Sequence, residues 1–124
     1  MIVRSNEVDA IETPGGNRST ALATPSRGAA EVSVIRQQQS PGGANPPHSH
    51  DREEVMVVLG GAVTVTVGDE RIDAATGDTV IVPPQTVHGI ENASGVPAEW
   101  LIVAPAGVRF FHANGDQATP PWSK

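Results

Sequence analysis

GGANPPHSHDREEVMVVLGG, residues 42–61, is the stretch that decides the fold of this chain. It holds two of the four histidines, His48 and His50, with Glu53 and Glu54 a few residues downstream. A proline pair precedes these polar residues and a run rich in β-branched side chains follows them, which favours strands on either side. The stretch therefore predicts a cluster of metal-ligating side chains carried by β-strands.

The spacing of the two histidines is that of neighbours on one face of a strand. Side chains alternate with period two along a strand, so the imidazoles of His48 and His50 can converge on one ion. A straight strand from His48 to Glu54 would be about 20 Å long at roughly 3.3 Å per residue, whereas metal ligands lie about 2 Å from the ion. The chain must therefore reverse before a carboxylate can help, and Asp51-Arg52 is suitable turn chemistry.

Two glutamates compete for the role of carboxylate ligand. If Glu54 faces the ion, Met56 and Val58 face the same side and line the cavity, because all three share one parity. Glu53 then faces away. We favour Glu54. The alternative for the whole stretch is a polar loop followed by the solvated start of a strand.

Short apolar runs between turn residues continue on both sides of this stretch. The 13 glycines and 11 prolines are spread along the chain and interrupt any helix of ordinary length. In residues 62–67 Val alternates with Ala and Thr in the period-2 pattern of a strand with two different faces. Further strands are expected at residues 31–39, 55–59, 70–74, 79–82, 87–91 and 99–104, with short strands or extended arms within residues 1–30. Some eight short strands without a credible helix indicate an all-β sandwich or barrel.

The composition is that of one acidic domain. A length of 124 residues suits a single core. The net charge of −6, with only 8 Lys and Arg, argues against nucleic acid or an anionic membrane as a partner. The absence of cysteine excludes disulfides, thiolate ligands and a cysteine nucleophile. Because no segment looks like a leader or a membrane span, we expect a cytoplasmic protein.

A second stretch supplies a third histidine. Residues 77–92, GDTVIVPPQTVHGIEN, place His88 after a strand and a proline-stiffened turn. Taken alone, His88 would be an ordinary core or surface residue. Read together, the two stretches resemble the paired motifs of the cupin superfamily.

The resemblance holds position by position and covers about two-fifths of the chain. The first family motif, G-x5-H-x-H-x3-E-x6-G, is met in full by Gly42, His48, His50, Glu54 and Gly61. The second, G-x5-P-x-G-x2-H-x3-N, is met by Gly77, Pro83, His88 and Asn92. Gln85 stands where the family usually has Gly, so the turn there should differ locally, since Gly tolerates backbone angles that are costly for Gln.

The cupin resemblance implies a single-domain, all-β, double-stranded β-helix (jelly-roll) barrel. We expect N-terminal strands or an arm in residues 1–30, the barrel core in 31–105 and a tail packed on the barrel in 106–124. The resemblance also implies one divalent ion, Fe, Mn, Ni, Co, Cu or Zn, and selects Glu54 over Glu53 independently of parity. The implied ligands are His48, His50, Glu54 and His88.

The pocket beyond the ligands is only partly defined by the pattern. Gln37 and Gln39 share one face of the strand before the first motif, and that face either lines the cavity or is exposed to solvent. Trp100 is expected in the core or at an interface, and His112, which has no motif context, at the surface.

The function that the resemblance implies is a small metal-dependent enzyme for a small organic substrate. Dioxygenase chemistry comes first, and isomerase or cyclase chemistry next. Glu54 would have a second role as general base if it detaches from the metal, as in some cupin dioxygenases. The alternatives are a module that binds or senses a small molecule without turnover, and a structural or storage protein.

Small cupins commonly dimerise, and an exposed sheet edge must be covered. We therefore expect a homodimer in which residues 1–30 supply a strand to the partner.

Overall fold

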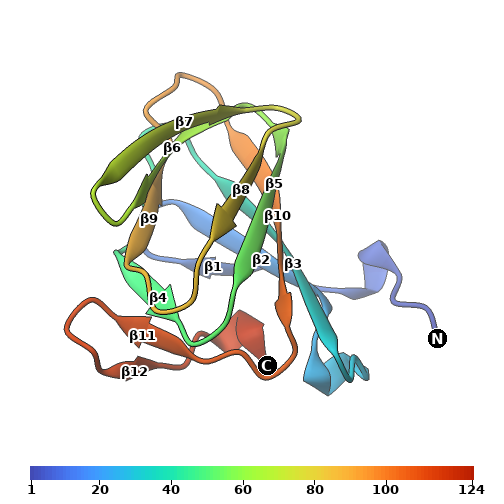
Figure 1. Cartoon of the computed structure of the whole chain (residues 1–124). Coiled ribbons are helices and arrows are strands. Elements are labelled where there is room, and N and C mark those ends of the chain that lie inside the picture. Colours follow the sequence, from blue (N-terminus) through green and yellow to red (C-terminus); the bar gives the residue numbers. More distant parts are fainter.

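The computed structural model describes residues 1–124, which form two six-stranded sheets facing each other (Figure 1). The first sheet consists, in spatial order, of β1 (Ile11–Thr13), β2 (Asn17–Ala23), β3 (Val32–Gln39), β10 (Ala98–Pro105), β5 (Glu54–Gly60) and β8 (Thr79–Val82). The second consists of β12 (Gln117–Ala118), β11 (Phe110–His112), β4 (His48–His50), β9 (His88–Glu91), β6 (Ala62–Val67) and β7 (Glu70–Ala75). All paired strands are antiparallel, which confirms the predicted all-β barrel.

The strands lie where the apolar alternation predicts them. β6 and β8 have the expected bounds, β3, β7 and β9 differ by one residue at one end, and β5 and β10 are one residue longer at each end. In β10 the side chains of Ala98, Trp100, Ile102 and Ala104 are buried, whereas those between them are only partly buried. A fully buried side chain of the size of Ile102 contributes roughly 1.5–3 kcal/mol. The alternation therefore gives each strand one face toward the core and one outward face.

The apolar core lies between the two sheets. Polar side chains occupy one end of the barrel. Val65, Met56, Val58 and Trp100 are each at most 1% exposed and belong to one cluster. The β6–β7 hairpin closes the upper end of the barrel in Figure 1, while β4, β11 and β12 lie at the lower end. The first residue of β5, Glu54, lies toward that lower end, and Met56 and Val58 follow it into the core.

Both chain termini add strands to the sheets. β2 pairs with β3 along most of its length, and β1 forms the outer edge beyond it. β11 pairs with β4 on one side and with β12 on the other. The N-terminal residues before β1 extend away from the body of the molecule (Figure 1), and Met1 and Ile2 are exposed.

The helical content is three short 3-10 turns: η1 (Ser5–Glu7), η2 (Pro25–Arg27) and η3 (Pro121–Ser123). None of these has the length or the apolar character that a helix needs to cross a membrane.

In the turn before β9, the residue at the position of the family glycine has a positive φ, the backbone angle that favours glycine. Gln85 has φ of +59° and is the one non-glycine residue with a positive φ. The expected local departure of this turn is therefore absent, and Gln85 bears the steric cost of the left-handed region instead. Its backbone N–H donates to the carbonyl of His50 at 2.6 Å, so the turn is tied directly to β4.

Candidate metal centre

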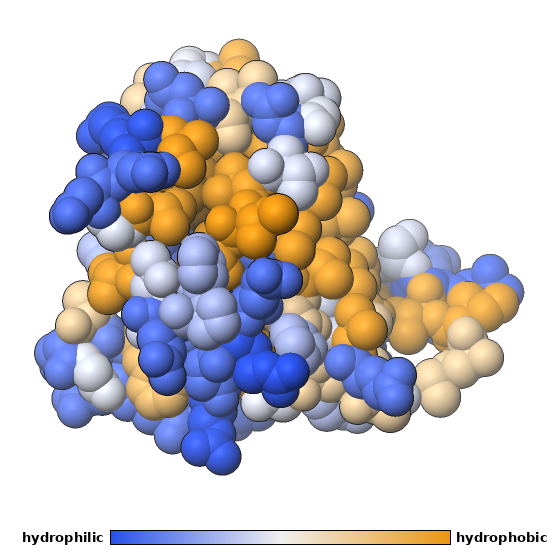
Figure 2. All heavy atoms as spheres, viewed as in Figure 1, coloured by the Kyte–Doolittle hydropathy of each residue, from blue (hydrophilic) through white to orange (hydrophobic).

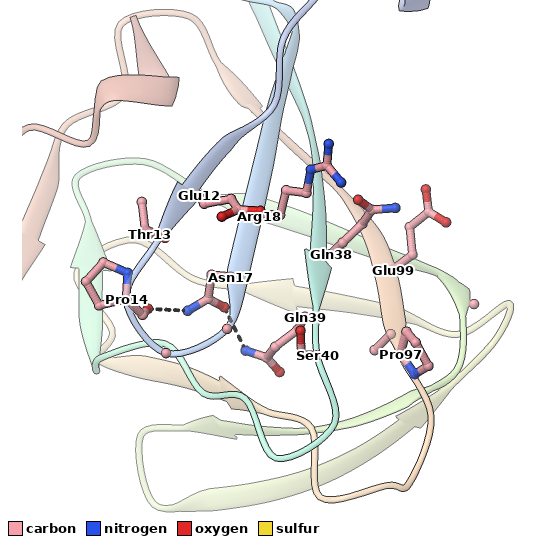
Figure 3. Close-up of a pocket in the computed structure, with 14 residues that line it drawn as sticks. Glu12, Thr13, Pro14, Asn17, Arg18, Gln38, Gln39, Ser40, Pro97 and Glu99 are labelled. Carbon is pink, nitrogen blue, oxygen red and sulfur yellow. Dashed lines mark hydrogen bonds between the residues drawn. The ribbon is translucent and has the colours of Figure 1, made fainter.

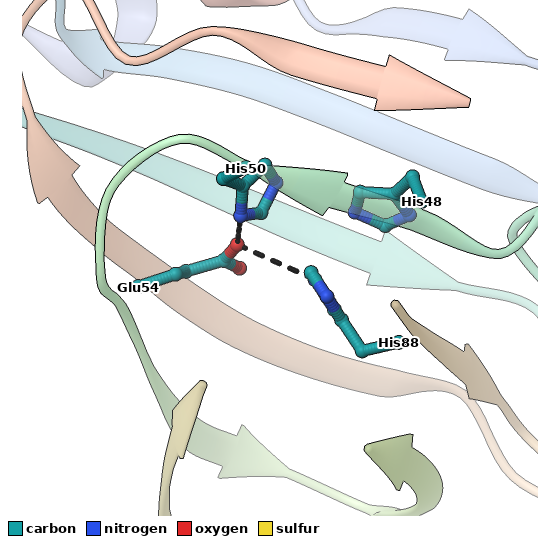
Figure 4. Close-up of side chains that lie close together, drawn as sticks. All are labelled: His48, His50, Glu54 and His88. Carbon is teal, nitrogen blue, oxygen red and sulfur yellow. Dashed lines mark ion pairs between the residues drawn. The ribbon is translucent and has the colours of Figure 1, made fainter. Parts of the chain in front are cut away.

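Three strands bring the two sequence motifs together at one end of the barrel (Figure 4). His48 and His50 occupy the two ends of β4, and the chain reverses over residues 51–53 before Glu54 begins β5. His88 begins β9, and its Cα is the register partner of His48. The reversal that the His–Glu spacing demands is therefore present, and Glu54 faces inward at 2% exposure while Glu53 is exposed.

The four side chains form one compact group of donor atoms. One donor atom from each of His48, His50, Glu54 and His88 lies within 4.8 Å of the other three. His50 Nδ1 lies 2.5 Å from Glu54 Oε2, and His88 Nε2 lies 3.5 Å from the same oxygen. Two ligands on opposite sides of one ion are about 4 Å apart, since each bond is about 2 Å long. The group needs only small shifts to surround a single cation.

Backbone carbonyls set the tautomers of two of the histidines. His48 Nδ1 lies 2.9 Å from the carbonyl of Pro46, and His88 Nδ1 lies 3.0 Å from that of Thr86. A carbonyl oxygen only accepts, so each Nδ1 carries the proton and donates it. The Nε2 lone pairs of His48 and His88 are then free to bind a metal, with the ring orientation fixed by the same hydrogen bonds.

Several buried donor atoms in the group have no hydrogen-bond partner. These atoms are both ring nitrogens of His50, Nε2 of His88 and Oε2 of Glu54. The close approach of His50 to Glu54 does not align as a hydrogen bond. A buried polar atom without a partner costs about 1–3 kcal/mol, so four of them at one point would be costly without a shared partner. A divalent cation is a partner that satisfies nitrogen and carboxylate lone pairs together, and the residues therefore fit one.

Burial and neighbouring charges shift the pKa values of the three histidine rings in different directions. Burial lowers the pKa of His50 to about 4 and also lowers the pKa of His48, with a further contribution from neighbouring His88. Burial alone would lower the pKa of His88 too, but the contact with Glu54 and its negative charge raise it. At neutral pH His48 and His50 are therefore neutral, as metal ligation requires.

A cavity of about 250 Å³ adjoins the donor group. Its walls include His48, His50 and Glu54, together with Gln37 from β3. The other three predicted pocket residues, Gln39, Met56 and Val58, do not line it. Met56 and Val58 have the predicted parity, but they lie further along β5, where the inward face packs into the apolar core.

The two glutamines of β3 are buried and have structural partners. Gln37 Nε2 donates to Ser19 Oγ at 3.1 Å, and Trp100 Nε1 donates to Gln37 Oε1 at 2.9 Å. Gln39 Nε2 donates to Asn17 Oδ1 at 2.9 Å and to the carbonyl of Ile90 at 3.2 Å. The alternative that these side chains lie on an exposed face is therefore wrong. Gln37 holds the cavity wall to the core, since it links β2, β3 and β10.

Much of the cavity wall comes from the chain termini, which the motif pattern does not reach. Thr13, Pro14, Asn17 and Ser19 contribute from the N-terminal side. The C-terminal contributors are Phe110, His112, Ala118, Pro120, Pro121 and Trp122. His112 is exposed as expected, but it also lines the cavity, because its register partner on the neighbouring strand is His48.

A second, wider groove lies on the outer face of the first sheet (Figure 3). It has a volume of about 650 Å³ and runs over Glu12, Arg18, Gln38 and Glu99, which are successive register partners across β1, β2, β3 and β10. None of the four donor residues lines this groove. Despite its size, it is not part of the candidate metal centre.

Comparisons with known proteins agree with this architecture. Germin-like protein subfamily 2 member 1 of Arabidopsis thaliana is 35% identical over 99 residues, which is 73% of this chain and 45% of that protein. Gentisate 1,2 dioxygenase 1 of Aquipseudomonas alcaligenes is 37% identical over 62 residues, 49% of this chain and 18% of that protein. The chain spans less than half the length of the curated relatives it matches.

Among solved structures, the polyketide cyclase RemF from Streptomyces resistomycificus superposes with a TM-score of 0.76 at 25% identity, covering 87% of this chain and 80% of that one. The family described as "Cupin domain" matches residues 35–104, which is more than half of the chain and includes both motifs in full. The resemblance in the two motifs and the predicted jelly-roll barrel are thus confirmed, and the chain belongs to the cupin domain family.

Proposed function

We propose that this protein is a metal-dependent enzyme that acts on a small organic substrate. One divalent ion would be held by His48, His50, Glu54 and His88. The observation that carries the proposal is the convergence of four donor residues beside a cavity of about 250 Å³; three of the four are buried and have donor atoms without a hydrogen-bond partner. Three imidazoles and one carboxylate suit Fe, Mn, Ni, Co, Cu or Zn.

The metal and the residues around it would have different roles in such a site. When bound, a divalent transition metal supplies Lewis-acid chemistry, or redox chemistry for Fe, Mn or Cu. The carbonyls of Pro46 and Thr86 hold two rings in the ligating tautomer. We propose that Glu54 would also serve as a general base toward an acidic substrate proton if its carboxylate detached from the metal.

Dioxygenase chemistry is our first reaction class, and isomerase or cyclase chemistry is the second. The donor set supports both, and the similar proteins include a gentisate 1,2 dioxygenase and a polyketide cyclase. The competing proposal is a module that binds or senses a small molecule without turnover. It predicts that a bound ligand is recovered chemically unchanged after long incubation with metal-loaded protein.

Oxygen consumption tests the proposal directly. Full-length protein would be reconstituted with Fe(II) or Mn(II) and supplied with a panel of phenols, diketones and thiols, with product analysis by mass spectrometry. We expect turnover that Glu54→Gln abolishes and that Glu53→Gln retains. No metal uptake, together with no oxygen consumption and no rearranged product, would contradict it.

We also propose a homodimer in which residues 1–30 contact the partner. Support comes from the short edge strand β1, from exposed Met1 and Ile2, and from the apolar surface over β5, β8 and β10 in Figure 2. Leu59 and Ile81, on the outward faces of two of these strands, are 44% and 61% exposed. Light scattering on the full chain should give twice the chain mass. A monomer that is unchanged by deletion of residues 1–12 would contradict this arrangement.

A further inference from the structure

The cavity beside the donor group has an aromatic corner built from the C-terminal part of the chain. The Phe110 ring packs edge-to-face against His50, with centroids 4.6 Å apart, and against Trp122, with centroids 5.4 Å apart. Both Phe110 and Trp122 line the cavity. A continuous row of rings therefore leads from the donor group to the cavity wall.

The C-terminal segment is held in place and does not hang free. Phe110 is the register partner of both His50 on β4 and Ala118 on β12. Ser26 Oγ donates to the main-chain oxygen of Lys124 at 2.7 Å, and Ser123 Oγ donates to the carbonyl of Pro120 at 2.7 Å. These bonds fix the turn η3 that carries Trp122, so the indole is a preorganised wall.

The cavity has no cationic side chain outside the donor group and His112. None of the chain's eight Lys and Arg residues lines it. The remaining polar side chains of the wall are neutral amides and hydroxyls, such as Asn17, Gln37 and Asn45. An anionic group of a ligand that bound here, away from the donor residues, would lose its hydration and gain no cationic partner. This loss costs free energy. The wall therefore selects against anionic groups at that position.

The volume limits the size of a ligand. A cavity of about 150 Å³ holds one benzene ring, and ligand pockets for drug-sized molecules range from about 300 to 1,000 Å³. At about 250 Å³ this cavity suits one or two fused rings. The edges and faces of Phe110 and Trp122 favour a planar ring, because aromatic pairs gain beyond the area that they bury.

We infer that residues 117–124 form the specificity-determining wall of the site and that Trp122 packs against a planar, uncharged substrate of one or two rings. The polar substituent of this substrate faces His48, His50 and Glu54. The inference rests on the proposed function only for the orientation of the substrate, with its polar substituent toward the metal ligands. Binding of the ring itself does not require the metal.

Calorimetric titration of the full-length protein tests the inference with three probes of similar size. 2-Naphthol is planar and uncharged, 2-naphthoate is planar and anionic, and 2-decalol is apolar but not planar. In metal-depleted protein we expect 2-naphthol to bind about tenfold more tightly than either of the others. Trp122→Ala should weaken 2-naphthol binding about tenfold, and Trp122→Phe should retain most of the affinity.

Phe111→Ala is the matched control, since Phe111 follows Phe110 on β11 but does not line the cavity. It should leave 2-naphthol binding unchanged. Thermal unfolding of each variant confirms that it folds, and Mn²⁺ titration of Trp122→Ala should match that of the wild type. A wild type that binds no metal but discriminates the probes would overturn the proposed function alone. Equal affinity for 2-naphthol and 2-naphthoate in metal-depleted protein, or an unaltered Trp122→Ala, would overturn the inference.

Discussion

The two motifs and the two chain termini contribute to the same site in different ways. The motifs place four donors within 4.8 Å of one another through strand parity, one reversal and one register pair. The termini supply cavity walls through pairing between distant segments, as when Phe110 lies opposite His50. In this chain, spacing within the two motifs and one register pair between them set the positions of the donors, whereas the shape of the cavity depends on the packing of the termini.

Burial differs between two of the motif donors and the end of the C-terminal wall. Glu54 and His88 are each 2% exposed, whereas Trp122 is only partly buried in the terminal wall. Segments with fewer buried contacts open at lower free energy than the core. Changes to the motifs should therefore affect metal binding, and changes to the terminal wall should affect ligand selection. The following predictions are ordered by the expected size of the effect.

The largest effect should come from removing a motif donor. Glu54→Gln keeps the size of the side chain but removes its charge, so we expect the affinity for Zn²⁺ or Mn²⁺ to fall about 100-fold or more. Competition titration with a chelator measures the change. Glu53→Gln removes the same charge from an exposed neighbour and should leave the affinity nearly unchanged. If both variants lost metal affinity equally, the loss would come from the change in overall charge and not from the removal of a ligand.

The second effect is a pH dependence confined to the motif region of the metal-free protein. The pKa of His50 is about 4 in the folded state, below the ordinary 6.5, so the folded state binds fewer protons between these values. Its contribution to stability is present above pH 6.5 and is lost as the pH falls toward 4. His48 acts in the same direction, whereas His88, with a raised pKa, acts in the opposite direction and stabilises at low pH.

We therefore expect the free energy of unfolding of metal-free protein to fall by on the order of 2 kcal/mol between pH 6.5 and pH 4. Urea unfolding at several pH values measures this change. His50→Gln should flatten the profile. An unaltered profile in that variant would assign the pH dependence to other groups.

The third effect concerns the link between the N-terminal strand and the core. Gln37→Leu would leave the buried indole N–H of Trp100 without its acceptor and Ser19 without its donor, which should cost about 1–3 kcal/mol. Gln38→Leu, at the next position on the outward face of β3, should cost much less. Chemical denaturation distinguishes the two. Similar values would show that the hydrogen bonds of Gln37 do not hold the wall.

The smallest effect is a gain in stability at the turn that ties the second motif to β4. Gln85→Gly should stabilise the protein by up to about 1 kcal/mol, because glycine adopts φ of +59° without the steric cost that Gln bears. Gln85→Ala retains that cost and should give no gain. A loss of stability in the glycine variant would mean that the exposed glutamine side chain has an unrecognised role.

The sequence predicted the parts of this molecule that depend on short-range geometry. The parity of Glu54, Met56 and Val58, and the reversal after His50, follow from strand periodicity alone, and all are present. Depth along the strand does not follow from parity: Met56 and Val58 have the predicted parity, but they pack in the apolar core and do not line the cavity of about 250 Å³. Only the tertiary packing shows that the inward face of β5 passes from the site into the core within two residues.

The contribution of the two chain termini to the cavity wall could not be predicted from the sequence, for a related reason. Nothing local to residues 110–122 indicates that Phe110 lies opposite His50, because that contact depends on strand pairing over 60 residues. The packing of Trp122 against Phe110 depends on how the tail folds back onto β11. The one available signal was the number of apolar and aromatic residues in a tail expected to pack on the barrel. Similarly, His112 is exposed as predicted, but its place in the cavity wall was not predicted, because no motif connects it to His48.

Metal content is the measurement that tests the central claim most directly. Full-length wild-type, Glu53→Gln and Glu54→Gln proteins would be purified in parallel without added metal and analysed by inductively coupled plasma mass spectrometry. The convergence of His48, His50, Glu54 and His88 predicts about one transition metal ion per chain in the wild type and in Glu53→Gln, and strong depletion in Glu54→Gln. Absence of metal from the wild type, with no uptake on reconstitution, would contradict the assignment of these four residues as a metal centre.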